Sequence, residues 1–182
     1  GDYSQMAFFG VLAGLNNSLT CSNMNLNSVQ GDKAILDILA SAGCTIDSKE
    51  DFITIHPSKL QPKTIDLSDC PDLGPILCVL ASYCDQTTTI INAQRLRMKE
   101  SDRIEAMEVE LKKWNVDIQT TFDTITIHGK SGYALDDIPI IDSHNDHRIV
   151  MAMCVFGLCA NTPCIIENAQ AITKSYPDFF ED

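Results

Sequence analysis

The sequence predicts an α/β domain built from a repeated unit, with buried helices at the centre and small sheets around them. Three observations lead to this prediction. Residues 43–56 and 115–128 align without gaps, and both stretches end in ITIH. Residues 66–81 and 142–157 also align, and the pentapeptides IINAQ and IENAQ follow them at the same spacing. Three predicted helices are apolar on nearly every face, which is typical of helices that other elements surround.

The first copy of the unit begins with an apolar helix near residues 2–15. The segment VLAGLNNSLT, from Val11, resembles the helix-to-strand part of the later copies. In the next helix the apolar residues recur at helical spacing, and Gly43 suits the left-handed conformation that ends a helix. Those apolar residues are Ile35, Ile38, Leu39 and Ala42. Two short β-rich runs joined by a polar turn follow.

The second copy has the same order, with an apolar helix at 72–84, a second helix that Asn115 closes, and β-rich runs at 116–119 and 124–128. The apolar face of its second helix carries Ile104, Met107, Leu111 and Trp114. The third copy has an apolar helix at 146–160. After Asp178 only FFED remains, so we expect this copy to be cut short or completed from elsewhere. The unit is therefore helix, strand, helix, strand, strand, used nearly three times.

Length and composition limit the possible functions. A chain of 182 residues with 45% hydrophobic content predicts a single soluble domain, residues 1–182. The net charge of -12 disfavours binding to nucleic acid or to an acidic membrane. No apolar run approaches the roughly 20 residues of a membrane span, and the start lacks a secretory signal. The eight cysteines show no metal-binding spacing, so we expect buried thiols, no metal and a cytoplasmic location.

Several charged residues occupy equivalent points of the repeat. Asp72 and Arg148 match at the start of two apolar helices, and Lys99, Glu100 and Arg103 lie where the next copy has Lys174. If rotation relates the copies, these helix starts meet at one end of the domain. Free backbone N–H groups and the positive end of the helix dipole favour anions there.

The basic residues near these helix starts predict a cationic patch suited to carboxylate and phosphate oxygens. Its members would be Arg97, Arg103, Arg148 and Lys174. Simpler interpretations remain open. The basic run at 95–103 could be a solvated face that pairs with its acidic neighbours. Asp102 and Asp72 could simply be helix caps without a role in binding or catalysis. His147 could be a structural hydrogen-bond donor, and His56 and His128 are assigned no role.

Three segments, RLRMKESDRIEAM, NDHRIVMAM and TKSYPDFF, resemble the 5-enolpyruvylshikimate-3-phosphate synthase family in both order and spacing. The resemblance extends to GDYSQMAFF, SVQGDKAILDILASAG and CPDLGP, and so covers nearly the whole chain. It implies an enzyme with two similar domains, each made of three βαβαββ units with pseudo-threefold symmetry, and an active site between them. This chain resembles the carboxy-terminal domain, and the amino-terminal domain is absent from it.

The resemblance also implies the reaction. Family members transfer the enolpyruvyl group of phosphoenolpyruvate to the 5-hydroxyl of shikimate 3-phosphate, releasing phosphate, in the shikimate pathway of aromatic amino acid biosynthesis. No metal or organic cofactor takes part. By this resemblance Asp72 would take the proton from the 5-hydroxyl, and Lys99 would contact that hydroxyl and share in proton handling. Glu100 would deliver a proton to the methylene carbon.

The same resemblance assigns the phosphoenolpyruvate contacts to Arg103, Arg148 and Lys174, with His147 beside them. Arg95 stands where some relatives have an asparagine, so its role is left open. We expect the isolated chain to fold without measurable turnover. Two alternatives are the related enolpyruvyl transferase that acts on UDP-N-acetylglucosamine, and a non-catalytic repeat domain that docks an acidic partner.

Overall fold

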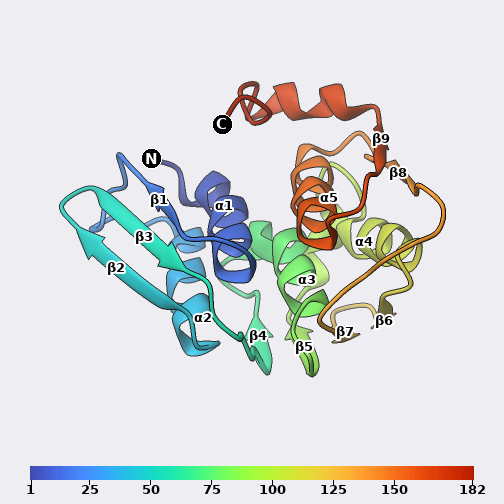
Figure 1. Cartoon of the computed structure of the whole chain (residues 1–182), viewed down its shortest axis with the longest axis horizontal. Helices are drawn as coiled ribbons and strands as arrows, with labels where there is room; N and C mark the ends of the chain where they lie inside the picture. The colour runs from blue at the N-terminus through green and yellow to red at the C-terminus, as the bar shows by residue number, and fades with distance from the viewer.

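Three helices that pack on one another form the centre of the computed structural model, which describes residues 1–182 (Figure 1). They are α1 (Tyr3–Leu15), α3 (Gly74–Ser82) and α5 (His147–Ala160). Phe8, Ile76 and Phe156, one from each helix, are completely buried. The prediction of central apolar helices is thus confirmed, and it follows from side chains that bury apolar surface in every direction around the helix axis.

Three small sheets surround these helices, and each has a simple strand order. The first sheet, β1-β3-β2, is antiparallel and consists of β1 (Leu19–Cys21), β2 (Thr45–Lys49) and β3 (Phe52–His56). The second, β4-β5-β7-β6, is mixed and consists of β4 (Thr64–Asp66), β5 (Thr87–Ile91), β6 (Asp117–Thr120) and β7 (Ile125–His128). The third is the parallel pair β8 (Ile140–Asp142) and β9 (Ile165–Glu167).

The sheets confirm the repeat inferred from the sequence. The order β1-β3-β2 matches β5-β7-β6, and the parallel pair β8-β9 matches β4-β5. The two ITIH segments hold the same register, because His56 lies opposite Thr45 and His128 lies opposite Asp117. The second unit is a complete βαβαββ unit, and the other two contain parts of the same arrangement.

The outer helices follow short 3-10 turns. In the first two units, η1 (Gly31–Lys33) leads into α2 (Ala34–Ser41) and η3 (Gln94–Met98) precedes α4 (Arg103–Lys112). The third unit has η4 (Ala169–Lys174), after which the chain runs across α5 and α1, with Phe179 against Phe8 and Phe9 (Figure 1). One further turn, η2 (Pro71–Leu73), opens α3.

Helix ends agree with the local sequence signals. Gly43 (φ 109°) and Asn115 (φ 60°) both adopt the left-handed conformation that ends a helix. The carboxylate of Asp102 accepts a hydrogen bond from the backbone N–H of Glu105. Asp102 therefore caps α4, which confirms the interpretation of this residue as a helix cap. None of the helices is both long and apolar enough to cross a lipid bilayer.

Candidate functional site

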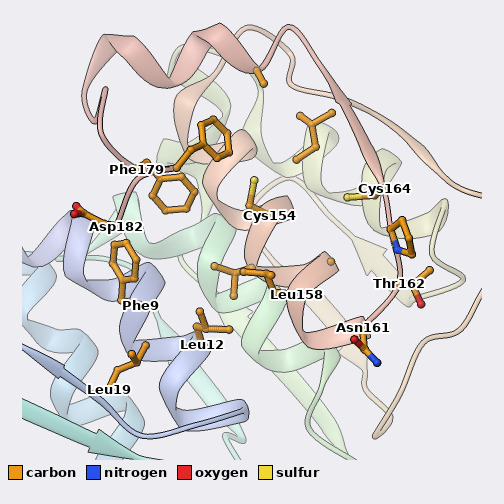
Figure 2. Close-up of a pocket in the computed structure, with 16 residues that line it drawn as sticks. Phe9, Leu12, Leu19, Cys154, Leu158, Asn161, Thr162, Cys164, Phe179 and Asp182 are labelled. Carbon is orange, nitrogen blue, oxygen red and sulfur yellow. The ribbon is translucent and has the colours of Figure 1, made fainter.

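A hollow of about 900 Å³ lies between α1, α5 and the last residues of the chain, but it is apolar (Figure 2). Phe9, Leu12, Leu158 and Phe179 line it, and Asp182 is its one charged residue. Moving a charged phosphate or carboxylate into such surroundings would be unfavourable without a cationic partner. None of the predicted site residues lines this hollow, so the candidate site lies elsewhere.

Three of the predicted residues come together around the carboxylate of Asp72, in η2. Its Oδ1 lies 2.9 Å from Lys99 Nζ and 3.0 Å from Arg103 Nη1, and its Oδ2 lies 3.6 Å from Arg148 Nη2. Lys99 follows η3, Arg103 begins α4 and Arg148 lies in the first turn of α5. Asp72 caps no helix, because its side chain accepts no backbone N–H there. The starts of helices from two units therefore converge, as the repeat predicted.

Arg103 forms the buried centre of this group. Its side chain is 1% exposed, and three carboxylates contact its guanidinium. Nη1 donates to Asp72, Nη2 donates to Glu100 at 2.5 Å, and Nε donates to Asp146 at 2.8 Å. A further bond, 3.2 Å from Nη2, makes the contact with Asp146 a two-point ion pair. We call Asp72, Lys99, Glu100, Arg103, Asp146 and Arg148 the charged cluster.

Sequence reasoning missed Asp146. This carboxylate is fully buried, caps α5 through the N–H of Arg148 at 2.9 Å, and accepts the Ser101 hydroxyl at 2.9 Å. An aspartate just before an apolar helix is a sequence signal for a cap, so that role could have been found. Its partner Arg103, 43 residues earlier, could not be identified without the fold.

The electrostatics keep these two aspartates ionised. Burial alone would raise the pKa of Asp72, but the Lys99 hydrogen bond and the charges of Arg148, Lys99 and Arg103 lower it below its ordinary value. Burial likewise opposes the ionisation of Asp146, and the hydrogen bond and charge of Arg103 lower its pKa. The structure thus places carboxylates among the predicted cations, and the guanidinium of Arg103 in particular is paired with three of them.

Two buried nitrogen atoms at the start of α5 have no hydrogen-bond partner, Nη1 of Arg148 and Nδ1 of His147. The nearest carboxylate oxygen to His147 Nδ1 belongs to Asp146, 3.9 Å away, which is too long for a hydrogen bond. Burial and the charge of Arg148 lower the pKa of His147, which favours the neutral ring. A buried polar group without a partner costs about 1–3 kcal/mol, so such a pair points to a place for a ligand.

Lys174 and Arg97 differ in their relation to the cluster. The Lys174 ammonium donates to the carbonyl of Asn145, directly before Asp146, so η4 also reaches this end of the molecule. Arg97 forms no ion pair within the cluster. Its nitrogens bind the Phe122 carbonyl at 2.8 Å and Asp102 at 2.9 Å, as in the interpretation that the basic run pairs with its acidic neighbours. Arg95 donates to the Ser68 carbonyl.

The first unit contributes residues that the sequence did not single out. Asp2 caps α1 by accepting the N–H of Ser4, and the Ser4 hydroxyl donates to the buried carboxylate of Asp32. Burial opposes the ionisation of Asp2, but hydrogen bonds from Gln30 and Ser4, with a smaller contribution from the charge of Arg148, lower its pKa. Burial raises the pKa of Asp32, and the Ser4 hydrogen bond and the charge of Arg148 oppose that rise. All three central helices therefore begin near the charged cluster.

The remaining potential ligand residues are scattered. No three His, Cys, Asp or Glu side chains gather in a way that could hold a metal ion. All eight cysteines are free thiols, four of them buried and four half-buried. Burial raises the pKa of the Cys78 and Cys154 thiols to about 12, so these thiols are weak nucleophiles near neutral pH.

Comparisons with known proteins match the whole chain to one family. The sequence profile of the family described as EPSP synthase (3-phosphoshikimate 1-carboxyvinyltransferase) matches residues 1–182. A relative named 3-phosphoshikimate 1-carboxyvinyltransferase, from Clostridium novyi (strain NT), is 47% identical over the whole chain, which spans 41% of that relative.

Two solved structures have the same fold. An EPSP synthase from Acinetobacter baumannii superposes on 98% of this chain with a TM-score of 0.83 and 30% identity, over 44% of its own length. The enolpyruvyl transferase NikO from Streptomyces tendae covers 99% of the chain with a TM-score of 0.76, over 41% of its own length, and at 16% identity it speaks for the fold alone. The chain spans less than half the length of each of these relatives.

Proposed function

The chain belongs to the EPSP synthase family, and we propose that it forms one side of an active site that transfers the enolpyruvyl group of phosphoenolpyruvate to the 5-hydroxyl of shikimate 3-phosphate. Phosphate is the second product. The rest of the site would come from the part of the relatives that this chain does not span. We place this reaction in the cytoplasm, in the biosynthesis of aromatic amino acids.

The observation that carries the proposal is the pair of unpartnered nitrogens at the start of α5, where Arg148 also contacts Asp72. Arg148 Nη1 is a buried donor without an acceptor, and His147 Nδ1 lies on the adjacent residue. Phosphoenolpyruvate offers carboxylate and phosphate oxygens, which are the acceptors that such a site lacks. Lys174 would add a third contact from η4, beside Asn145. The positive end of the α5 helix dipole would also stabilise an anionic ligand there.

Asp72 has the position and charge of a general base. Lys99 and Arg148 now hold its carboxylate ionised. When two anionic substrates bind, these cations would share their charge with substrate oxygens, and the pKa of Asp72 would rise toward its ordinary value. A carboxylate whose pKa rises becomes a better acceptor for the proton of the 5-hydroxyl. Lys99, in contact with Asp72, would orient that hydroxyl.

Glu100 would take the complementary role of general acid, and because it is ion-paired with Arg103 as a carboxylate, it would first take up a proton from solvent. Its side chain is 44% exposed, and so can reach a bound substrate. Arg103 holds Glu100 through Nη2 and Asp72 through Nη1, so one rigid guanidinium separates the acid from the base. The addition step requires proton delivery to the methylene carbon while a base acts at the hydroxyl. In this arrangement Arg103 positions both groups, in addition to any contact with phosphoenolpyruvate.

A hybrid enzyme tests the proposal. In it, this chain replaces the matching 41% of the Clostridium novyi relative. We expect phosphate release that requires both phosphoenolpyruvate and shikimate 3-phosphate, and none when UDP-N-acetylglucosamine replaces the second substrate. The 182-residue chain alone is expected to release no phosphate. A folded hybrid that binds neither substrate would contradict the proposal.

Binding to the chain separates catalysis from simple docking. Nuclear magnetic resonance titration with phosphoenolpyruvate and shikimate 3-phosphate should shift signals of His147, Arg148 and Lys174. An unrelated acidic peptide serves as the control. Equal shifts with the peptide would favour a non-catalytic anion-docking domain.

A further inference from the structure

Two other 3-10 turns contact η2, the turn that carries Asp72. These are η1, in the first unit, and η3, in the second. A Cβ atom added to Gly31 would lie 2.3 Å from the carbonyl oxygen of Asp69, three residues before Asp72. One added to Gly74 would lie 2.5 Å from the Leu96 side chain. The first contact is with backbone, which cannot move aside as a side chain can, so residue 31 must be glycine for this approach.

Gln30 fixes the same segment to α1. Its side-chain oxygen accepts the backbone N–H of Tyr3 at 3.0 Å, and its amide group donates to Asp2 at 2.7 Å and to the Ser4 hydroxyl at 2.8 Å. The first turn of a helix has free N–H groups, and one of them is satisfied here by a residue 27 positions away. Gln30 therefore ties η1 to the start of a central helix.

Asp32 extends this connection toward the charged cluster. It is 7% exposed and accepts the Ser4 hydroxyl, which is itself buried. The charge of Asp72 disfavours the ionised form of Asp32 and the charge of Arg148 favours it, so Asp32 lies within the electrostatic reach of both residues. Gln30, Gly31 and Asp32 have no direct role in the proposed reaction.

We propose that Gln30, Gly31 and Asp32 form a positioning element for Asp72. The inference rests on the proposed function, in which Asp72 is the general base. The element does not contact substrate. It sets the distance between the η2 backbone and the start of α1, and thereby places the Asp72 carboxylate against Lys99 and Arg148. The first unit thus contributes to a site whose reacting groups come from the second and third units.

The variant Gly31→Ala in the hybrid enzyme tests this inference, with Gly132→Ala as the matched control because a Cβ there meets nothing within 4 Å. The added methyl must push η1 away from Asp69 and so displace Asp72. A misplacement of about 1 Å can cost about a hundredfold in rate. We expect kcat to fall by about tenfold to a hundredfold, while KM for phosphoenolpyruvate stays within about threefold. The control should match the parent hybrid.

Two additional variants make each outcome decisive. Asp72→Asn should abolish turnover, and if it does not, the proposed role of Asp72 fails and the positioning element fails with it. If Asp72→Asn is inactive and folded Gly31→Ala keeps the parent kcat, the positioning inference alone is wrong. Should Gly31→Ala fail to fold, Gln30→Met decides, because it removes the three side-chain bonds at similar volume. Its kcat should also fall with KM preserved, and an unchanged kcat would overturn the inference.

Discussion

Arg103 and Asp146 form a two-point ion pair that is buried on both sides, with Nε to Oδ2 at 2.8 Å and Nη2 to Oδ1 at 3.2 Å. The pair joins the first residue of α4 to the cap of α5, and so connects the second unit to the third. Transferring a charged group from water into the protein interior is unfavourable unless an opposite charge accompanies it. Removing one partner would therefore leave the other as a buried, unpaired charge. We therefore expect this ion pair to hold the residues of the charged cluster in place.

Asp146→Ala should lower the free energy of unfolding of the 182-residue chain by about 3–5 kcal/mol, because it leaves Arg103 buried without its main partner and removes a helix cap. Urea unfolding followed by circular dichroism measures the change. Lys112→Ala is the control, since the Lys112 side chain is 57% exposed and its pair with Glu108 should contribute less than about 1 kcal/mol. Equal losses in the two variants would contradict the buried-pair argument.

Arg148→Ala should behave in the opposite way. Its guanidinium has one unpartnered nitrogen and only a 3.6 Å contact with Asp72, so stability should change little. The affinity of the hybrid enzyme for phosphoenolpyruvate should fall by about tenfold to a hundredfold, the usual effect of losing a hydrogen bond to a charged group. Isothermal titration calorimetry measures the affinity. Lys130→Ala, which removes a cation outside the cluster, should leave it unchanged.

Replacing Arg103 should affect both substrate binding and stability. The resemblance predicts that Arg103→Ala mainly weakens phosphoenolpyruvate binding. Because Arg103 contacts Asp72, Glu100 and Asp146, the variant should also destabilise the fold. Arg148→Ala is consequently the cleaner test of substrate binding.

Glu100→Ala should lower kcat of the hybrid enzyme by at least about a hundredfold, the usual scale for losing a positioned acid or base. Glu105→Ala, an exposed glutamate on the first turn of α4, is the matched control. Steady-state phosphate release measures both. An unchanged rate for Glu100→Ala would remove this residue from the mechanism.

The pH dependence of stability follows from the lowered pKa values of Asp72 and Asp146. Their stabilising contribution is fully present above the ordinary pKa, about 3.8, and is lost as pH falls through the lower pKa of the folded state. Unfolding free energy should therefore drop below about pH 4, and Asp146→Asn should make that drop shallower.

Asp32 has the opposite sign, because burial raises its pKa. Its contribution is present below the ordinary pKa and is lost as pH rises through the raised pKa. Asp32→Asn should therefore make the acid drop steeper. Urea unfolding at pH 7, 5, 4 and 3 distinguishes the two variants, and the same slope change in both would contradict the electrostatic account.

Elements that depend on local chemistry could be predicted from the sequence. The ends of helices at Gly43 and Asn115 follow from backbone conformations that few residues adopt, and the cap at Asp102 follows from its neighbour Glu105. The matching ITIH segments predicted that two copies of one unit are present, and the structure pairs both segments with their neighbouring strands at equivalent positions.

Features that depend on distant partners could not be predicted. Glu110 is fully buried, where it binds Lys113 at 2.7 Å and His144 at 2.8 Å, yet in the sequence it is one of many helical glutamates. Asp146 and Asp32 were likewise not recognised as buried carboxylates. The repeat predicted that basic residues converge, but it could not show that carboxylates from other segments neutralise them.

A crystal structure of the hybrid enzyme with phosphoenolpyruvate and shikimate 3-phosphate bound tests the central claim most directly. We predict that oxygens of phosphoenolpyruvate lie within hydrogen-bonding distance of Arg148 Nη1 and His147 Nδ1, with the 5-hydroxyl of the second substrate beside Asp72 and Lys99. Substrates bound away from α5, with Arg148 Nη1 still lacking a partner, would contradict it.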